Sequence, residues 1–244
     1  ELKKNPSMKA RLPNYLKTSH YNISFQKNSF KQIGNNIRLA IGNKLKKESK
    51  ELGGDGYVWI SCKGPANNKP VVEVEIKPVY DGETFKCLIK YEKEEREVEC
   101  AKNVKECASI DLGVTNLATM FIPGHRPLVF DGKEIKGVNR KTIRNVAKLS
   151  KNGIVANSKK HHSLWAERDN KIMNMLHTAS KMVIDTITSL QIKHLIIGYN
   201  VNWKYKCKIG KRNTADFCTI PYRKFVDMLF YKGNDVGIEV REVN

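Results

Sequence analysis

Short apolar runs alternate with turn signals along residues 1–106. The runs are rich in β-branched or aromatic residues, as strands are, and pairs such as Asp55-Gly56 and Asp81-Gly82 separate them. Several short strands at this spacing are typical of a small barrel or sandwich. We therefore predict that residues 1–106 form an N-terminal domain with a small β-barrel fold. The predicted strands lie at 21–25, 37–41, 57–60, 71–76 and 85–89.

The pattern changes after residue 106, and we predict a second domain at 107–244. Three consecutive strand-like runs precede a basic, helix-compatible stretch. A long helix follows at about 163–190, because apolar residues recur there at steps of three, four or seven. A buried strand, a helix from Pro221 to Gly233 and a final strand complete the pattern. This order, βββ-α-β-α-β, is that of the ribonuclease H-like fold, in which helices flank a mixed sheet. The fold class is therefore mixed α and β.

The charge of the chain indicates what kind of partner it binds. Lys and Arg total 44 against 25 Asp and Glu, which gives a formal net charge of +19. A surplus of this size attracts polyanions, of which nucleic acid is the commonest. An anionic membrane surface is the alternative, but no apolar run is long enough to span a bilayer. We expect nucleic-acid partners, and neither a membrane nor a small-molecule substrate.

Cysteine spacing and the chain ends bear on the cellular setting. None of the six cysteines forms a CxxC pair, so we expect reduced thiols in a nuclear or cytoplasmic protein. The chain starts at Glu1 without an initiator Met and stops at Asn244 directly after a predicted strand. We therefore expect it to be part of a longer protein.

Asp111 is the candidate catalytic residue. It follows an apolar strand, and Gly113 leaves room beside it for a metal ion and a phosphate group. An Asp before a Gly is more often a turn residue, but the flanking strand and its hairpin partner favour a functional role. Nucleases of the ribonuclease H-like fold use three or four carboxylates to hold two Mg²⁺ ions, which require hard oxygen ligands.

Four blocks of the sequence resemble one family, in the order that the family has them. The segment from Asp111 to Ala118 resembles the first RuvC motif of the transposon-encoded TnpB nucleases and of the related Fanzor proteins. The Gly198-Tyr199-Asn200 segment, followed by Trp203-Lys204, resembles the second block of one branch of that family. The two remaining blocks are Ile220 to Phe225, which resembles the block that follows, and Pro6 to Pro13, which resembles the start of the wedge domain.

The resemblance implies an RNA-guided DNA endonuclease. In such proteins a guide RNA is bound by the wedge and RuvC domains and pairs with the target DNA strand, so the protein mainly contacts backbones. The RuvC site then cuts the DNA with Mg²⁺. Residues 1–106 would be the wedge-like, guide-binding domain and 107–244 an incomplete RuvC domain.

The sequence departs from many RuvC nucleases at the second acidic position, which here is Asn200. In the Gly-Tyr-Asn branch, the resemblance implies that a later segment supplies this acid. Glu242 is the nearest candidate in the chain, and the alternative is that it is a solvated residue at a strand end. The family's zinc-binding insert and final Asp would lie beyond residue 244, so we expect Zn²⁺ only there.

Basic runs suggest where nucleic acid binds. Such runs are often only solvated faces, but two of them flank the predicted nuclease strand at 194–199, which favours a phosphate track. Trp203 either stacks on a base or caps the sheet. The predicted nucleic-acid contacts are Lys9, Arg11, Arg140, Lys141, Arg144, Lys148, Lys159, Lys160, Arg168, Lys171, Trp203, Lys204, Lys211 and Arg212.

Two other functions remain open. A nuclease-inactive relative would use guide RNA only to occupy DNA, and Asn200 is compatible with this reading. A guide-free resolvase or transposase of the same fold is the third possibility.

Overall fold

The structure is a computed structural model that describes residues 21–62, 69–79, 84–93, 106–153, 158–205 and 207–243. The chain divides into two compact units, Glu1–Lys93 and Glu94–Asn244. The assignment of the first part as a wedge-like domain and of the second as a RuvC domain stays a prediction.

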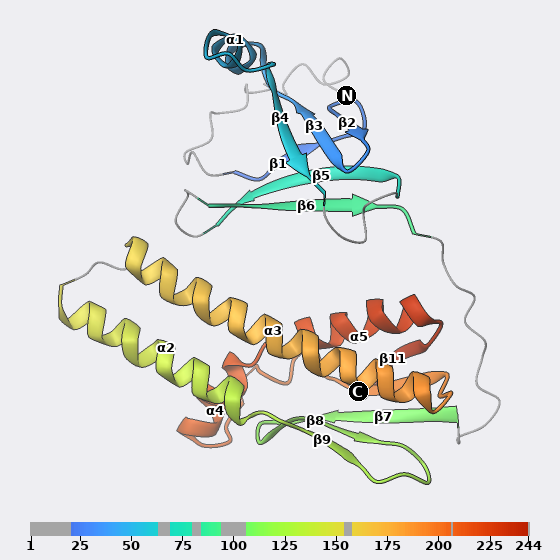
Figure 1. The fold of residues 1–244 in the computed structure, drawn as a ribbon. Coiled ribbons are helices and arrows are strands. Elements are labelled where there is room, and N and C mark those ends of the chain that lie inside the picture. The colour runs from blue at the N-terminus through green and yellow to red at the C-terminus, as the bar shows by residue number, and fades with distance from the viewer. Residues whose placement is uncertain are drawn as a thin grey trace, which may run out of the picture. The chain divides into compact units, whose positions relative to one another are not determined.

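The N-terminal unit contains two three-stranded sheets, ordered β1-β5-β6 and β2-β3-β4, in which all neighbours are antiparallel. Side chains from both sheets, including Ile37, Leu39 and Val74, form one core and are fully buried. Figure 1 shows these strands in blue to green. The elements are β1 (Ile23–Phe25), β2 (Phe30–Ile33), β3 (Asn36–Ala40), α1 (Asn43–Glu51), β4 (Tyr57–Ser61), β5 (Val71–Pro78) and β6 (Phe85–Tyr91).

A closed barrel is not present in the described part of this unit, so the predicted barrel is not confirmed. The strand ladders end at β1 and β6 in one sheet and at β2 and β4 in the other, so neither sheet closes on itself. Strand spacing is compatible with either a barrel or two packed sheets. Helix α1, which buries none of its side chains, was also not predicted.

The second unit is built on a five-stranded mixed sheet with the order β11-β10-β7-β8-β9. Strands β7, β10 and β11 run parallel, whereas β8 and β9 are antiparallel to their neighbours. This arrangement confirms the prediction of a mixed α and β fold. The strands are β7 (Cys107–Leu112), β8 (Asn116–Phe121), β9 (Leu128–Asp131), β10 (His194–Gly198) and β11 (Glu239–Val243).

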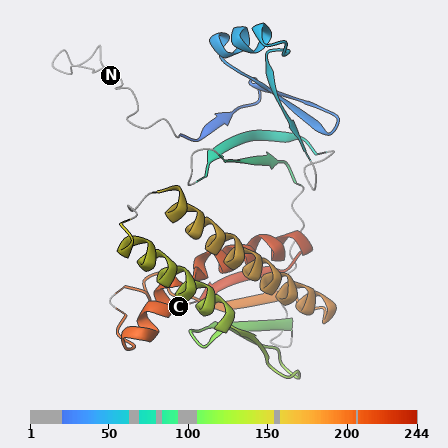
Figure 2. The ribbon, with the colours of Figure 1, turned by 60° about the vertical axis from the view of Figure 1, so that its left-hand side comes forward.

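The helices of this unit follow the strands in the chain order expected, with one addition. The basic stretch forms α2, and the long amphipathic helix forms α3, whose first turn is capped by the Ser158 hydroxyl. Helix α4 was not predicted. Figures 1 and 2 show α2, α3 and α5 on one side of the sheet. The helices are α2 (Lys133–Lys151), α3 (Lys159–Ser189), α4 (Lys211–Thr219) and α5 (Tyr222–Val236).

The sequence predicted that helix α5 ends at Gly233, and this boundary is wrong. The helix continues to Val236 and ends at Gly237, which has the left-handed backbone conformation (φ 80°) that favours glycine. Gly233 is instead a contact point, because a Cβ atom there would come within 2.6 Å of the Val240 side chain. The glycine therefore lets α5 approach β11 closely.

Burial alternates along the central strands of the sheet. In β7, Ala108, Ile110 and Leu112 are buried under the helices, whereas Ser109 and Asp111 are exposed on the other face. The sheet is thus covered by helices on one face, and the Asp111 side chain lies on the opposite one. Among the described residues, no helix is long and apolar enough to cross a membrane.

Candidate metal and nucleic-acid site

Asp111 lies where the three parallel strands end. It is the register partner of Gly198 in β10, and Gly198 is the partner of Val243 in β11. In open sheets of this kind, ligands bind at the carboxyl ends of the strands. The Asp111 carboxylate is exposed there, and no hydrogen bond or ion pair is recorded for it among the described residues. Because Gly198 has no side chain, the space beside Asp111 over β10 is open.

A hydrogen bond from helix α5 holds the turn after Asp111 in place. The Tyr222 hydroxyl donates a hydrogen bond of 2.6 Å to the carbonyl oxygen of Gly113. Tyr222 is fully buried, and burial raises the pKa of its phenol far above the usual value, so it stays a neutral donor. The backbone of Gly132 closes the turn on the other side by donating to Thr115 at 3.2 Å. Asp111 therefore precedes a turn that these two hydrogen bonds hold in place.

The structure does not bring Glu242 to Asp111. Glu242 is in register with Ile197 of β10, which is in register with Ile110 of β7. Successive residues of a strand point to opposite faces, so the side chains of Asp111 and Glu242 project from opposite faces of the sheet. Glu242 also accepts a hydrogen bond of 2.6 Å from Arg223 Nη1, which occupies its carboxylate.

Asn200 follows the end of β10 and stabilises its own turn. Its side-chain oxygen accepts a 2.9 Å hydrogen bond from the backbone N–H of Asn202. Within the described ranges there is no group of three or more His, Cys, Asp and Glu side chains placed to hold a metal ion. Of the predicted acids, Asp111 alone lies exposed at the strand ends, which fits it for a metal but supplies a single ligand.

Trp203 is packed inside an aromatic cluster and not displayed for stacking. Its ring lies edge-on to Tyr199, Phe217 and Tyr222, with centroid distances of 5.3, 5.0 and 4.9 Å. Such edge-to-face packing is favourable in its own right. This geometry favours the capping alternative over base stacking.

Lys204 forms hydrogen bonds with the protein's own backbone. Its ammonium group donates to the carbonyl oxygens of Ile220 (2.5 Å) and Cys218 (3.1 Å) at the end of α4. Burial lowers the pKa of Lys204. A cation at a helix C-terminus is stabilised by the helix dipole, so this lysine attaches the turn after β10 to α4.

Arg140 and Arg168 are also structural. Arg140 forms an ion pair with Asp216, which is 6% exposed. Arg168 donates to the side-chain oxygen of Asn139 at 2.7 Å and to the carbonyl oxygen of Thr219 at 2.8 Å. These contacts join α2, α3 and α4. The sequence showed that these arginines are charged. It did not show which groups form ion pairs or hydrogen bonds with them.

Most of the other cations predicted to bind nucleic acid are exposed. Lys171 is exposed but bridges to Glu167 along α3 at 2.5 Å. Lys9 and Arg11 lie outside the described residues, and Lys211 begins α4 without a described side chain. The cations that are exposed are Lys141, Arg144, Lys148, Lys159, Lys160 and Arg212.

Residues 88–204 match the family model OrfB_IS605, described as a probable transposase. The matched range is 117 of the 244 residues, just under half of the chain. It includes β7 with Asp111, helices α2 and α3, and the Gly198-Tyr199-Asn200 segment. Two of the four blocks that suggested the family therefore lie within it.

Solved structures similar to this chain include two Cas12f complexes. One is a Cas12f1 complex with sgRNA and target DNA, at 15% identity and a TM-score of 0.45, and the chain covers 61% of it. The other is a CRISPR-Cas12f ternary complex, at 13% identity and a TM-score of 0.43, with 57% covered. Both matches cover 100% of this chain, which thus spans about three fifths of those proteins. No curated protein matches the chain.

Proposed function

We propose that this chain is part of an RNA-guided, Mg²⁺-dependent DNA endonuclease of the TnpB type, with a RuvC domain of ribonuclease H-like fold. One observation carries the proposal. Within the range that matches the probable-transposase family model, an exposed Asp111 stands at the edge where three parallel strands end. Ligand sites of open α/β sheets lie at that edge.

Asp111 would be one carboxylate ligand of the metal site. When bound, paired Mg²⁺ ions activate the attacking water and stabilise the leaving oxygen of a phosphodiester. The contribution of this chain is to place Asp111: Tyr222 fixes the following turn through Gly113, and Gly198 keeps the neighbouring space open. Further acids would have to come from another segment, because Glu242 points to the opposite face.

Guide RNA and target DNA are the proposed partners. The net charge of +19 favours a polyanion, and the exposed cations of α2, including Lys141, Arg144 and Lys148, extend along a helix that follows the nuclease strands. A protein whose sequence specificity comes from base pairing needs backbone contacts of this sort.

A nuclease-inactive, RNA-guided DNA-binding protein is the second candidate. The observation that favours it concerns Asn200 and Glu242, the two other positions considered for the second acid. Asn200 caps its own turn, and Glu242 is paired with Arg223. A guide-free transposase is the third, in keeping with the family description.

The test is cleavage of a plasmid by the full-length protein with its guide RNA and Mg²⁺. We expect cutting at the site complementary to the guide, and movement of the cut when the guide sequence is changed. Guide-dependent binding without cutting would support the inactive binder. Full activity of RNA-free protein would support the guide-free transposase, and either result would overturn the proposal.

A further inference from the structure

Two helices that are far apart in the sequence, α2 and α4, line one open groove of about 520 Å³. Its lining residues are Asn139, Arg140, Ile143 and Arg144 of α2 and Arg212, Ala215, Asp216 and Thr219 of α4. We propose that this groove binds a single unstacked nucleotide of a nucleic-acid chain, with its phosphate on Arg144 and Arg212 and its base against Ile143 and Ala215. The inference rests on the proposed function only in taking nucleic acid as the partner.

The floor of the groove is polar, rigid and already satisfied. Asp216 is 6% exposed and is paired with Arg140. Asn139 is 2% exposed, and its amide nitrogen donates to the Thr219 hydroxyl at 3.1 Å. Because the buried carboxylate is neutralised by Arg140, the floor does not repel an anion.

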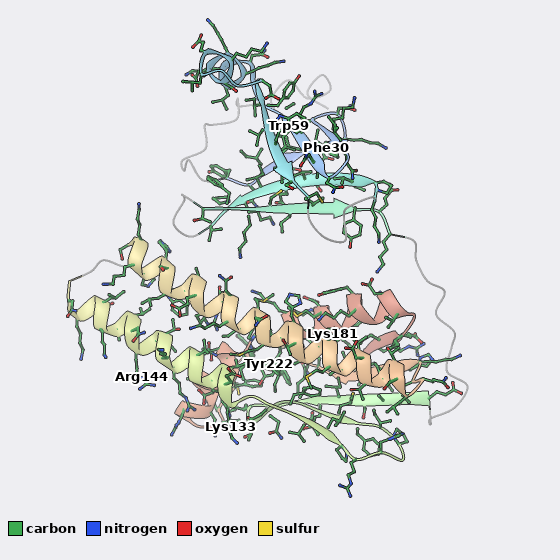
Figure 3. The ribbon with its side chains drawn as sticks, viewed as in Figure 1. Phe30, Trp59, Lys133, Arg144, Lys181 and Tyr222 are labelled. Atoms are coloured by element: carbon green, nitrogen blue, oxygen red, sulfur yellow. The ribbon has the colours of Figure 1, made fainter. Side chains whose placement is uncertain are left out.

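Two arginines remain available at the mouth of the groove. Arg144 and Arg212 are exposed, and within the described part of the chain no acidic partner is recorded for either. The contact recorded for Arg144 is a 3.3 Å hydrogen bond from its Nε to the Arg140 carbonyl oxygen, which leaves its terminal nitrogens for other acceptors. Figure 3 shows Arg144 on α2. Two guanidinium groups beside one cavity suit a phosphate, which accepts paired hydrogen bonds from arginine.

The walls supply an apolar surface beside these charges. Ile143 is 46% exposed, and Ala215 lines the same groove from α4. A base packs on an apolar or planar surface once it leaves its stack. The volume lies within the range of small-ligand sites, roughly 300 to 1,000 Å³, so the groove has room for a nucleotide.

RNA and DNA present the same phosphate and base faces, and the test distinguishes them. Single-stranded RNA and DNA of one sequence are titrated with the full chain, and binding is followed by fluorescence anisotropy at several salt concentrations. The groove variant is Arg144→Ala with Arg212→Ala. The matched control is Lys133→Ala with Lys181→Ala, two exposed lysines away from the groove that carry the same total charge.

We expect the groove variant to bind at least one of the two nucleic acids about tenfold more weakly than the control. Loss of two phosphate contacts should also reduce the slope of log affinity against log salt by about 1.4, at roughly 0.7 per contact for single strands. Equal affinities of groove variant and control for both nucleic acids would overturn the proposal.

A second variant separates the cavity from its charge. Ala215→Trp fills the groove without changing any charge, and Ala215 is exposed on α4, so the helix tolerates the larger side chain. We expect about tenfold weaker binding with an unchanged salt slope, and a thermal melt like that of the wild type. Wild-type affinity in this variant would show that no nucleotide enters the groove.

These outcomes are independent of DNA cutting. If the groove variants lose affinity while the wild-type protein never cuts guided DNA, the nuclease proposal fails and the groove remains. If guided cutting is observed and the groove variants bind with wild-type affinity, the nuclease proposal stands and the groove proposal fails.

Discussion

The Tyr222 hydroxyl is the contact that joins helix α5 to the turn after Asp111. It donates to the Gly113 carbonyl oxygen from a fully buried position. A hydrogen bond of this kind contributes about 1 kcal/mol to stability, and more when its loss leaves a buried group unpaired. At the scale of single residues, this contact therefore determines how firmly Asp111 is placed.

Tyr222→Phe should lower the free energy of unfolding by about 1 kcal/mol, because Gly113 loses its donor while the packing of the ring is kept. Urea denaturation measures this loss. If Asp111 binds Mg²⁺, the variant should also need more Mg²⁺ for half-maximal cleavage while its rate at saturating Mg²⁺ is largely retained. An unchanged unfolding free energy together with an unchanged Mg²⁺ requirement would show that the hydrogen bond has no such role.

Local sequence was sufficient to locate Asp111, because a strand followed by a carboxylate and a glycine is a short-range pattern. It was insufficient for Arg140, Arg168 and Lys204. A run of cations indicates a positive surface, but the partners of these three on other elements lie 14 or more positions away in the chain. The register that separates Asp111 from Glu242 is likewise a tertiary property.

At the scale of elements, close helix-strand packing depends on Gly233. A Cβ atom there would meet the Val240 side chain at 2.6 Å and the Ile238 carbonyl oxygen at 3.2 Å. We expect Gly233→Ala to destabilise the protein by about 1 to 3 kcal/mol through overpacking. Thermal or urea unfolding measures the change.

Gly137 is the matched control for that substitution. It also lies inside a helix, α2, but a Cβ atom there would meet nothing within 4 Å. Gly137→Ala should therefore stabilise the protein by about 1 kcal/mol, because alanine is the better helix former. Equal effects of the two substitutions would contradict the proposed contact between α5 and β11.

Arg168 joins three helices, and its removal should be costly. Arg168→Ala would leave the Asn139 side-chain oxygen and the Thr219 carbonyl oxygen without their donor. We expect a loss of about 2 kcal/mol in unfolding free energy. Arg144→Ala, on the exposed side of α2, should change it by less than about 0.5 kcal/mol. Differential scanning calorimetry of the two variants compares a structural arginine with a surface one, and similar values would contradict the distinction.

The hydrophobic pattern predicted most elements of the second unit, because the sheet buries one face and α3 buries one stripe. Helix α4 was missed because its nine residues make fewer than three turns, which is too short a stretch for apolar periodicity to identify a helix. In the first unit, the pattern located β1, β3, β4, β5 and β6 and missed β2, and it did not show how the strands pair. Sheet closure depends on which strand edges meet, and strand spacing does not determine that.

At the scale of the whole molecule, two compact units carry a net charge of +19, and the family match spans residues 88–204. The chain corresponds to about three fifths of the solved proteins that it resembles. The proposal assigns this chain one metal ligand and a nucleic-acid surface, and it requires further acids from another segment because Glu242 points to the opposite face of the sheet.

Single-turnover cleavage of guided target DNA by full-length Asp111→Ala tests the central claim most directly. The matched control is Asp185→Ala, which removes an exposed carboxylate on α3 that is paired only with Lys181 among the contacts recorded. We predict that Asp111→Ala loses cleavage by a factor of at least about 1,000 while still binding guide RNA and target. The control should cut at the wild-type rate. Cleavage by Asp111→Ala at the rate of the control would contradict the account.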